Sequence, residues 1–435
     1  MDFSQTIHFI GIGGIGVSAL AKYHFSQGKQ VSGSDISSSL LTKELEDLGA
    51  KIFIGKHKKT NLPKTAGSII YTAAISQDNP ELKEAKKRKL EIKSYAEAVG
   101  ELTKKYETIT VSGAHGKSTT TALSALVLIE GYFDPTVIVG TKLKEFDDSN
   151  FRRGYGSHLV LEADEWNKSF LHYSPTIAIV TNIDAEHLDT YKNIESVKKT
   201  FEEYLSKVPP DGAIIANADD ELSKSVAKRF GKKVLWYSTT DREAGIIKRV
   251  IKIPGEYNVS NALAATKLGR LLGVREPDII RAIAGFNGAW RRFEFKGILE
   301  SGACLFSDYG HHPTEIHKTI MAARNKFPFR RIWCIYQPHQ YQRLKYLWKE
   351  FTTAFDMADR ICLLPVYDVA GRENQDFKSK VNSVKLTDEL TRRGKNACYF
   401  NSFQNAETLF NMESKRGDVV LVMGAGDLHY NLNKG

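Results

Sequence analysis

The chain has 435 residues, more than one hydrophobic core usually supports, and we expect three domains. Apolar residues make up 42% and charged residues 26% of the chain, which is typical of a folded globular protein and excludes the disordered and membrane classes. The formal net charge of +10 would suit a nucleic-acid partner, but the lysines are spread along the chain and no recognition motif accompanies them, so we expect no nucleic-acid binding.

The sequence pattern predicts neither a membrane-spanning helix nor a secretion signal. No apolar run approaches the roughly 20 residues that a membrane-spanning helix needs, and the start MDFSQTIHFIGIGG has neither the basic flank nor the cleavage site of a secretion signal. We therefore expect a cytoplasmic protein without membrane contact, either a monomer or a weak homodimer. The four cysteines form no CxxC pair, which favours reduced thiols over a zinc or redox site.

The first predicted domain, residues 1–103, begins with a β-loop-α-β pattern in which the second strand, VSGSD, ends at Asp35. Its loop, GIGGIG, has the spacing of a dinucleotide-binding fingerprint. Gly11 permits the turn, Gly13 lets the backbone approach a diphosphate and Gly16 allows close helix packing. Asp35 can accept hydrogen bonds from ribose hydroxyls. The motif does not distinguish NAD from a UDP-sugar, and glycines also make plain turns.

The second predicted domain, residues 104–294, begins with a strand, the loop SGAHGKS and a helix. In a phosphate-binding loop, backbone N–H groups surround the anion, Lys117 adds a positive charge and the Ser118 hydroxyl ligates magnesium. The full Walker spacing is missing, because Val111 stands where the first glycine belongs. The position between a strand and a helix favours the phosphate site. Further apolar runs predict a parallel sheet flanked by helices.

Acidic and imidazole side chains follow two strands of this domain, in EADE and in TNIDAEHLDTY. They are Glu162, Asp164, Glu165, Asp184, Glu186, His187 and Asp189. The carboxyl ends of parallel strands face bound ligands, and such groups beside a phosphate loop suit magnesium and phosphoryl oxygens. The alternative for either cluster is an ordinary first helical turn, where Asp and Glu are common.

The third predicted domain, residues 295–435, contains four apolar strands separated by amphipathic segments. Before it, Asn258 and Asn261 lie one helical turn apart and can reach the same ligand, although Asn258 can also cap the helix. The remaining candidate ligand-binding side chains are Arg292, Asp308, His339 and Arg343. The predicted fold is α/β with three domains: an N-terminal Rossmann-like domain, a central P-loop-type mononucleotide-binding domain and a C-terminal Rossmann-like domain.

Taken in order, the motifs resemble those of the Mur ligase family along nearly the whole chain. They are GIGGIG, SGAHGKSTTT, EADE, TNIDAEHLDTY, PGEYNVSNALAA, RRFE, DYGHHPTEI, QPHQY and MGAGD. The sequence is most similar to the alanine-adding members, because it contains DYGHHPTE and lacks, at residues 200–203, the carbamylated lysine of several sister ligases. The resemblance implies an ATP-dependent ligase that joins L-alanine to the lactyl carboxylate of UDP-N-acetylmuramate through an acyl phosphate, for peptidoglycan precursor synthesis.

The resemblance also implies a role for each matching residue. The UDP-sugar would bind at Gly11, Ile12, Gly13, Gly14, Ile15, Gly16 and Asp35. ATP would contact Gly113, Ala114, His115, Gly116, Lys117, Ser118, Thr119, Asn258, Asn261, Arg292 and Asp308. The ligands of Mg²⁺ would be Ser118, Glu162 and His187. The catalytic residues would be Lys117, Glu162, His187, His339 and Arg343, of which the last two would orient L-alanine.

Four residues depart from the family pattern. Ala114 replaces a threonine, Trp166 and Asn167 stand where relatives have a Ser-Asp pair, and Gln340 replaces a basic residue. These departures leave open a Mur-type ligase that adds a different amino acid or a peptide, and a catalytically silent relative. An NAD-dependent oxidoreductase would account for GIGGIG and Asp35, but it leaves SGAHGKS and the acidic clusters unexplained.

Overall fold

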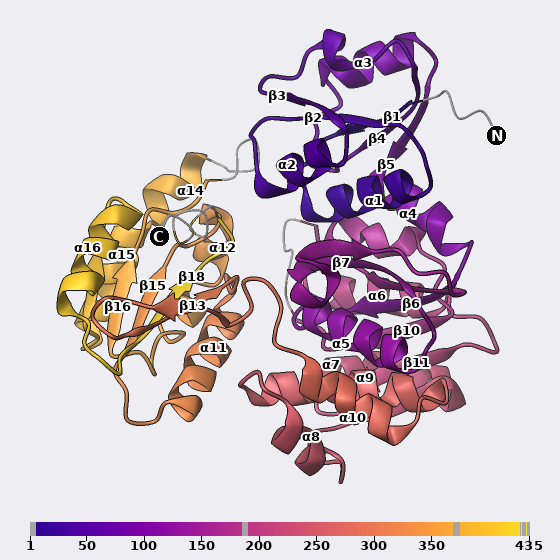
Figure 1. The fold of residues 1–435 in the computed structure, drawn as a ribbon. Coiled ribbons are helices and arrows are strands. Elements are labelled where there is room, and N and C mark those ends of the chain that lie inside the picture. Colours follow the sequence, from indigo (N-terminus) through magenta and orange to yellow (C-terminus); the bar gives the residue numbers. More distant parts are fainter. Residues whose placement is uncertain (1–5, 185–189, 369–374, 427, 429–431, 433–435) are drawn as a thin grey trace. The chain divides into compact units, whose positions relative to one another are not determined.

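The computed structural model describes residues 6–184, 190–368, 375–426, 428 and 432. The chain forms two compact units, one of Met1–Ile251 with Val259–Phe286 and the other of Lys252–Asn258 with Asn287–Gly435. The described residues form three sheets, two in the first unit and one in the second (Figure 1). The expected three-domain α/β fold is confirmed. The boundaries after residues 103 and 294 stay a prediction.

The first sheet is entirely parallel, with the order β3-β2-β1-β4-β5. Its strands are β1 (Thr6–Ile10), β2 (Val31–Asp35), β3 (Lys51–Ile54), β4 (Ala66–Tyr71) and β5 (Glu91–Ser94). The connecting helices are α1 (Ile15–Ser26), α2 (Leu40–Asp47), η1 (Lys59–Asn61), α3 (Pro80–Lys87) and α4 (Tyr95–Thr103). The strand order reverses beside β1, so the loop after β1 lies where open parallel sheets bind ligands.

The second sheet has the order β12-β11-β10-β6-β9-β7-β8, and β8 is its antiparallel edge strand. Its strands are β6 (Glu107–Ser112), β7 (Thr136–Leu143), β8 (Ser149–Arg152), β9 (His158–Glu162), β10 (Ile177–Val180), β11 (Ala213–Asn217) and β12 (Val234–Tyr237). The central strands are buried along almost their whole length, which explains the apolar runs in β9, β10 and β11.

The helices around the second sheet follow the strands in the alternating order of an α/β domain. They are α5 (Lys117–Glu130), η2 (Lys144–Phe146), η3 (Trp166–His172), α6 (Ile194–Leu205), α7 (Glu221–Ala227), η4 (Lys228–Lys233), α8 (Ala244–Val250), α9 (Glu256–Leu271) and α10 (Glu276–Gly285). In α9, the residues from Val259 onward belong to the first unit.

The sheet of the second unit has the order β13-β14-β18-β15-β16-β17, with β13 antiparallel. Its strands are β13 (Glu294–Ile298), β14 (Cys304–Asp308), β15 (Ile332–Tyr336), β16 (Arg360–Leu363), β17 (Ala397–Tyr399) and β18 (Val419–Met423). Its helices are α11 (Pro313–Lys326), α12 (Tyr341–Tyr346), α13 (Trp348–Phe351), α14 (Gln375–Lys380), α15 (Ser383–Arg392) and α16 (Phe403–Glu413). The sequence predicted only the four inner strands, because both edge strands are half exposed and lack an apolar run.

Within the first unit, the two sheets are joined by buried contacts. The Asn150 side chain on β8 donates to the carbonyl oxygen of Ile15 at 2.6 Å and to the Ser18 hydroxyl at 2.9 Å, both on α1. Gly100 on α4 lies against η3, where a Cβ atom would be 2.5 Å from the carbonyl oxygen of His172. The helices of the first sheet therefore pack directly on elements of the second.

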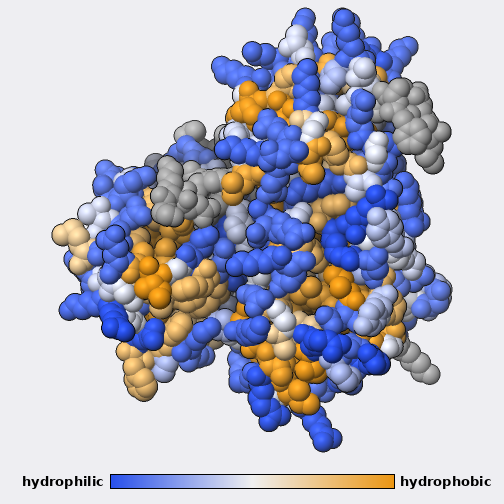
Figure 2. Space-filling view, in the orientation of Figure 1, coloured by the Kyte–Doolittle hydropathy of each residue, from blue (hydrophilic) through white to orange (hydrophobic). Residues whose placement is uncertain are grey.

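Hydrophilic side chains cover most of the face shown in Figure 2, with smaller groups of apolar side chains between them. Among the described residues, no helix combines the length and the apolarity that crossing a membrane requires.

The packing of Gly100 gives a test of the contact between α4 and η3. Gly100→Ala should lower the free energy of unfolding by about 1–3 kcal/mol, because the new methyl group meets a backbone carbonyl that cannot rotate away. Gly245→Ala on α8 is the matched control, since a Cβ there meets no atom within 4 Å. Denaturant unfolding of both variants measures the difference. Equal midpoints for both variants would contradict the tight contact.

Candidate active site

The loop between β6 and α5 turns through two glycines. Gly113 has a φ of +130° and Gly116 a φ of +83°, both in the region that L side chains rarely adopt. A Cβ atom on Gly113 would lie 2.2 Å from Thr181 Oγ1, and one on Gly116 would lie 2.4 Å from Asn261 Oδ1. Both positions therefore require glycine, for backbone conformation and for space.

Asn182, which follows β10, holds this loop in place. Its Oδ1 accepts a hydrogen bond from the backbone N–H of His115 at 2.8 Å, and its Nδ2 donates to the carbonyl oxygen of His115 at 2.8 Å. Its own carbonyl oxygen accepts from the N–H of Ala114 at 3.2 Å. The cap residue of α5 is Gly116, which has no side chain to accept the first helical amides. A fixed loop that leads into such a helix start suits an anion.

Lys117, the first residue of α5, makes a buried ion pair with Glu165. Its Nζ lies 3.0 Å from Glu165 Oε2 and 2.7 Å from the carbonyl oxygen of Gly113. Only 13% of the Lys117 side chain and 3% of the Glu165 side chain is exposed. Glu165 is held in turn, because the Tyr191 hydroxyl donates to its carbonyl oxygen at 2.6 Å. The sequence pointed to the EADE cluster but did not identify Glu165 as the partner of Lys117.

Ser118 and Glu162, two of the expected magnesium ligands, lie in contact. The Ser118 hydroxyl donates to Glu162 Oε1 at 3.1 Å, and the N–H of Gly140 donates to Glu162 Oε2 at 2.7 Å. A hydroxyl and a carboxylate beside a phosphate loop are the hard oxygen donors that Mg²⁺ prefers, so these residues fit that ion. The third expected ligand, His187, lies outside the described residues.

The other expected nucleotide contacts divide between the two units. Thr119 is buried on α5, and Asn261 on α9 lies against the loop glycine Gly116. Asn258 lies in the first turn of α9, within the second unit, and its Nδ2 donates to the carbonyl oxygen of Pro254 at 2.6 Å. In this bond the side chain donates to a carbonyl oxygen four residues earlier, which is not the bond of a helix cap, and the contact of Asn258 with ATP stays a prediction.

The glycine-rich loop after β1 is held by the end of β2. The N–H groups of Gly11 and Ile12 both donate to the carbonyl oxygen of Ser34, at 2.8 and 3.1 Å. The N–H of Gly13 donates to Asp35 Oδ2 at 2.8 Å. Asp35, which we expected to face a ribose, therefore also fixes the loop itself.

The rest of this loop leads directly into a helix. Gly14 caps α1, which starts at Ile15. A Cβ atom on Gly16 would lie 2.7 Å from the Tyr95 hydroxyl on α4. The absence of a side chain at Gly16 thus permits α1 to approach α4, which is the packing role that the fingerprint gives its third glycine.

In the second unit, Asp308 at the end of β14 is buried. Its carboxylate accepts hydrogen bonds from the N–H groups of Phe293 at 2.8 Å and Gly310 at 2.7 Å. Burial raises the pKa of Asp308, and the nearby Arg292 guanidinium opposes this shift. Arg292 also lies 3.6 Å from Glu315 and above the Tyr309 ring. Asp308 and Arg292 therefore lie near each other, and their contact with ATP stays a prediction.

His339 and Arg343 also lie together, after β15. Arg343 Nη1 is 3.3 Å from His339 Nδ1, and the His339 ring stacks on Tyr367 with a centroid distance of 5.5 Å. Gln340, between them, has a φ of +72°, and its N–H donates to the carbonyl oxygen of Tyr367 at 3.1 Å. The departure at Gln340 thus occupies a strained backbone position beside the two candidate residues.

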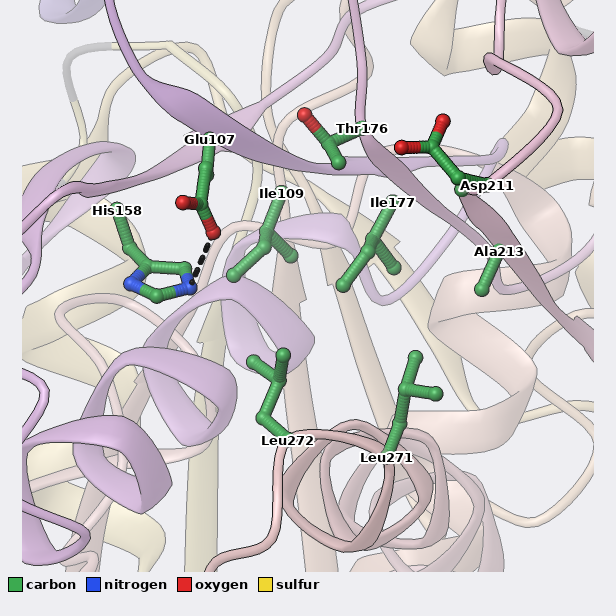
Figure 3. Close-up of a pocket in the computed structure, with 10 residues that line it drawn as sticks. Glu107, Ile109, His158, Thr176, Ile177, Asp211, Ala213, Leu271 and Leu272 are labelled. Atoms are coloured by element: carbon green, nitrogen blue, oxygen red, sulfur yellow. Dashed lines mark ion pairs between the residues drawn. The ribbon is translucent and has the colours of Figure 1, made fainter.

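A pocket of about 170 Å³ lies at the opposite edge of the second sheet from the phosphate loop. Figure 3 shows Ile109 and Ile177 pointing toward Leu271, the last residue of α9, and Leu272, which follows it, and the ion pair of Glu107 with His158 at the side of the pocket. It lies at the amino ends of β6, β9, β10 and β11, away from the edge where such sheets bind nucleotides. It is also smaller than most ligand pockets, which occupy roughly 300–1,000 Å³.

Three family models match the chain in sequence order. They are "Mur ligase family, catalytic domain" at residues 6–107, "Mur ligase middle domain" at residues 111–269 and "Mur ligase, glutamate ligase domain" at residues 291–426.

Two relatives are similar to this chain along almost the whole length of both sequences. The chain is 38% identical to the UDP-N-acetylmuramate--L-alanine ligase of Clostridium botulinum (strain Okra / Type B1), over 98% of this chain and 96% of that protein. It is 36% identical to the ligase of the same name from Clostridium tetani, over 99% and 97%. The crystal structure of a UDP-N-acetylmuramate-alanine ligase from Thermotoga maritima is similar with a TM-score of 0.83 and 29% identity, covering 99% of this chain and 97% of that one.

The role of Asn182 in holding the loop between β6 and α5 can be tested by substitution of its side chain. Asn182→Ala should weaken the binding of a nucleoside triphosphate roughly tenfold, or by about 1.4 kcal/mol, because the loop loses both side-chain bonds to His115. Titration with a fluorescent ATP analogue measures the affinity. Asn193→Ala is the control, since it removes only the cap of α6 and should leave affinity unchanged. Unchanged affinity in Asn182→Ala would contradict this role.

Proposed function

The chain belongs to the Mur ligase family, and from this premise we propose that it is an ATP-dependent ligase joining L-alanine to the lactyl carboxylate of UDP-N-acetylmuramate, in peptidoglycan precursor synthesis. The observation that carries the proposal is the phosphate loop, in which Lys117 pairs with Glu165 and Ser118 contacts Glu162. These contacts occur in a chain that matches ligases of that name over nearly its whole length.

The first step activates the carboxylate of the sugar. A lactyl carboxylate oxygen attacks the γ-phosphorus of ATP, the bond to the ADP oxygen breaks, and an acyl phosphate and ADP result. Negative charge develops on the oxygens around the γ-phosphorus, and a fixed cation stabilises it. The long flexible stem of Lys117 allows its ammonium to turn from Glu165 and the loop carbonyls toward these oxygens.

We propose that Ser118 and Glu162 hold Mg²⁺. The 3.1 Å contact between their oxygens supports this assignment, and His187 stays a predicted further ligand. When bound, the ion would neutralise charge on the phosphoryl oxygens and orient them for in-line transfer.

The second step uses the amine of alanine. Its nitrogen attacks the acyl carbon, and phosphate leaves from the tetrahedral intermediate. We propose that Arg343 binds the carboxylate of L-alanine, because a guanidinium matches a carboxylate with two parallel hydrogen bonds. His339 is then the proposed proton acceptor for the amine. Its stacking on Tyr367 and its contact with Arg343 support a fixed orientation for the ring.

The UDP moiety is proposed to bind at the loop of Gly11, Ile12, Gly13, Gly14, Ile15 and Gly16, with Asp35 beside it. The bonds that the loop donates to Ser34 and Asp35 support this assignment, because they fix the backbone of the loop before a ligand arrives. Preorganised amides at the start of a helix favour a diphosphate.

A Mur-type ligase with another amino acid is the second candidate, and the glutamine at position 340 is the observation that favours it. ATP turnover with UDP-N-acetylmuramate across the twenty amino acids and short peptides, with product mass recorded, decides between the two. We expect turnover with L-alanine and a product heavier by one alanine residue. Turnover only with glycine, serine or a peptide would replace the proposed substrate.

The catalytic role of Lys117 gives a separate prediction. Lys117→Ala should lower ADP formation by at least roughly 100-fold, because charge on the γ-phosphoryl group loses its fixed cation. Calorimetry should find unchanged UDP-N-acetylmuramate binding, which also shows that the variant is folded. Lys198→Ala, on the surface of α6, is the control and should keep full activity. Turnover like that of the wild type in Lys117→Ala would contradict the assignment.

A further inference from the structure

One carboxylate of the first sheet's domain is completely buried and accepts four hydrogen bonds. Glu81 Oε2 accepts from His8 Nε2 at 2.9 Å and from the Ser34 hydroxyl at 2.8 Å. Glu81 Oε1 lies 2.8 Å from His57 Nδ1 and accepts from Asn61 Nδ2 at 2.9 Å. We call these five residues the Glu81 cluster. Its donors come from β1, β2, η1 and the segment after β3, so the cluster joins four parts of the domain.

The carboxylate is held in its charged form. Burial alone would raise the pKa of Glu81, but the hydrogen bonds from His57, His8, Ser34 and Asn61 outweigh burial and lower the pKa to about 2. An ionised carboxylate can only accept hydrogen bonds, and its four lone-pair positions match the four donors. A buried charge is costly unless it is fully bonded. The cluster satisfies this condition.

The charge also fixes which ring nitrogens donate to the carboxylate. Because Glu81 accepts, His8 carries a hydrogen on Nε2 and His57 carries one on Nδ1. His8 Nδ1 lies 2.9 Å from the Ser32 hydroxyl. Each of the four hydrogen bonds to Glu81 therefore has one direction.

Ser34 connects this cluster to the glycine-rich loop. Its hydroxyl donates to Glu81, while its carbonyl oxygen accepts from the N–H groups of Gly11 and Ile12. The carboxylate of the next residue, Asp35, accepts from the N–H of Gly13 in the loop. The end of β2 therefore holds the loop through the carbonyl oxygen of Ser34, and it is itself held by Glu81 through the Ser34 hydroxyl.

We propose that Glu81 is a positioning residue for the UDP-sugar: it fixes Ser34, and Ser34 fixes the backbone of the loop that leads into the amides at the start of α1, where the diphosphate would bind. The inference rests on the proposed function, because that function gives this loop its ligand. The expected effect is confined to one substrate. Loss of the Glu81–Ser34 bond loosens the loop and weakens UDP-sugar binding, while the ATP loop, which is held by Asn182, is unaffected.

Two serines on β2 provide a matched pair of variants. Ser32 and Ser34 are both buried, and both hydroxyls belong to the same hydrogen-bonded network. Only Ser34 donates to Glu81 and contacts the loop. Ser34→Ala should raise the KM for UDP-N-acetylmuramate roughly tenfold, equivalent to about 1.4 kcal/mol. The KM for ATP and kcat should stay within about twofold of the wild type. Ser32→Ala should leave all three constants within the same limits.

The outcomes distinguish a role of Glu81 in positioning the loop from a role in the stability of the fold alone. A purely structural role would lower the unfolding temperature of both variants and leave the KM of the folded enzyme unchanged, and that result would overturn the inference. Glu81→Gln should raise the KM for UDP-N-acetylmuramate at least as much as Ser34→Ala. The NH₂ group of the glutamine is a donor, and it would face partners that also donate. If Glu81→Gln does not fold, the comparison of the two serine variants still decides.

Direct binding distinguishes failure of this inference from failure of the proposed function. Calorimetry of the wild-type protein with UDP-N-acetylmuramate should give a measurable affinity, and Ser34→Ala should weaken it roughly tenfold. No binding to the wild type would overturn the proposed function and the inference together. Equal binding by the wild type and Ser34→Ala would overturn the inference alone.

Discussion

The buried ion pair between Lys117 and Glu165 is the interaction on which the candidate active site depends. An ammonium enclosed by the carbonyl oxygens of a tight loop needs a countercharge, and Glu165 provides one within 3.0 Å. Because Glu165 follows β9 and Lys117 begins α5, the pair also ties two neighbouring strand ends together. The two glycines of the loop and the side-chain amide of Asn182 hold the loop backbone whose carbonyl oxygens surround this ammonium.

Much of the site could be predicted from local sequence, because each strand-loop-helix motif is continuous in the chain. The contact between Ser118 and Glu162 followed from the expectation that strand ends meet at one edge of a sheet. The partners Glu165 and Asn182 could not be chosen in advance, since several acids and amides share those strand ends and only tertiary packing selects one. Glu81 carried no signal, because its partners at positions 8, 34, 57 and 61 form no motif.

Two departures from the family pattern have a physical explanation in the structure. Ala114 contributes backbone groups to the phosphate loop, since its N–H bonds to Asn182 and its carbonyl oxygen lies 3.4 Å from Lys117 Nζ. A threonine hydroxyl is therefore not needed to hold the loop. Asn167 has a φ of 52°, in the left-handed region that asparagine tolerates better than most residues. Nothing in the structure explains the choice of tryptophan at position 166.

The bonds from Asn150 to α1 have a consequence for the choice of substrate. They attach the helix that follows the glycine-rich loop to an edge strand of the sheet that carries the phosphate loop, inside one compact unit. Under the proposed function, this attachment keeps the loop proposed for the diphosphate and the loop proposed for the γ-phosphate within one packed unit. The proposed substrate must then carry its acid group far enough from the diphosphate to reach the phosphorus.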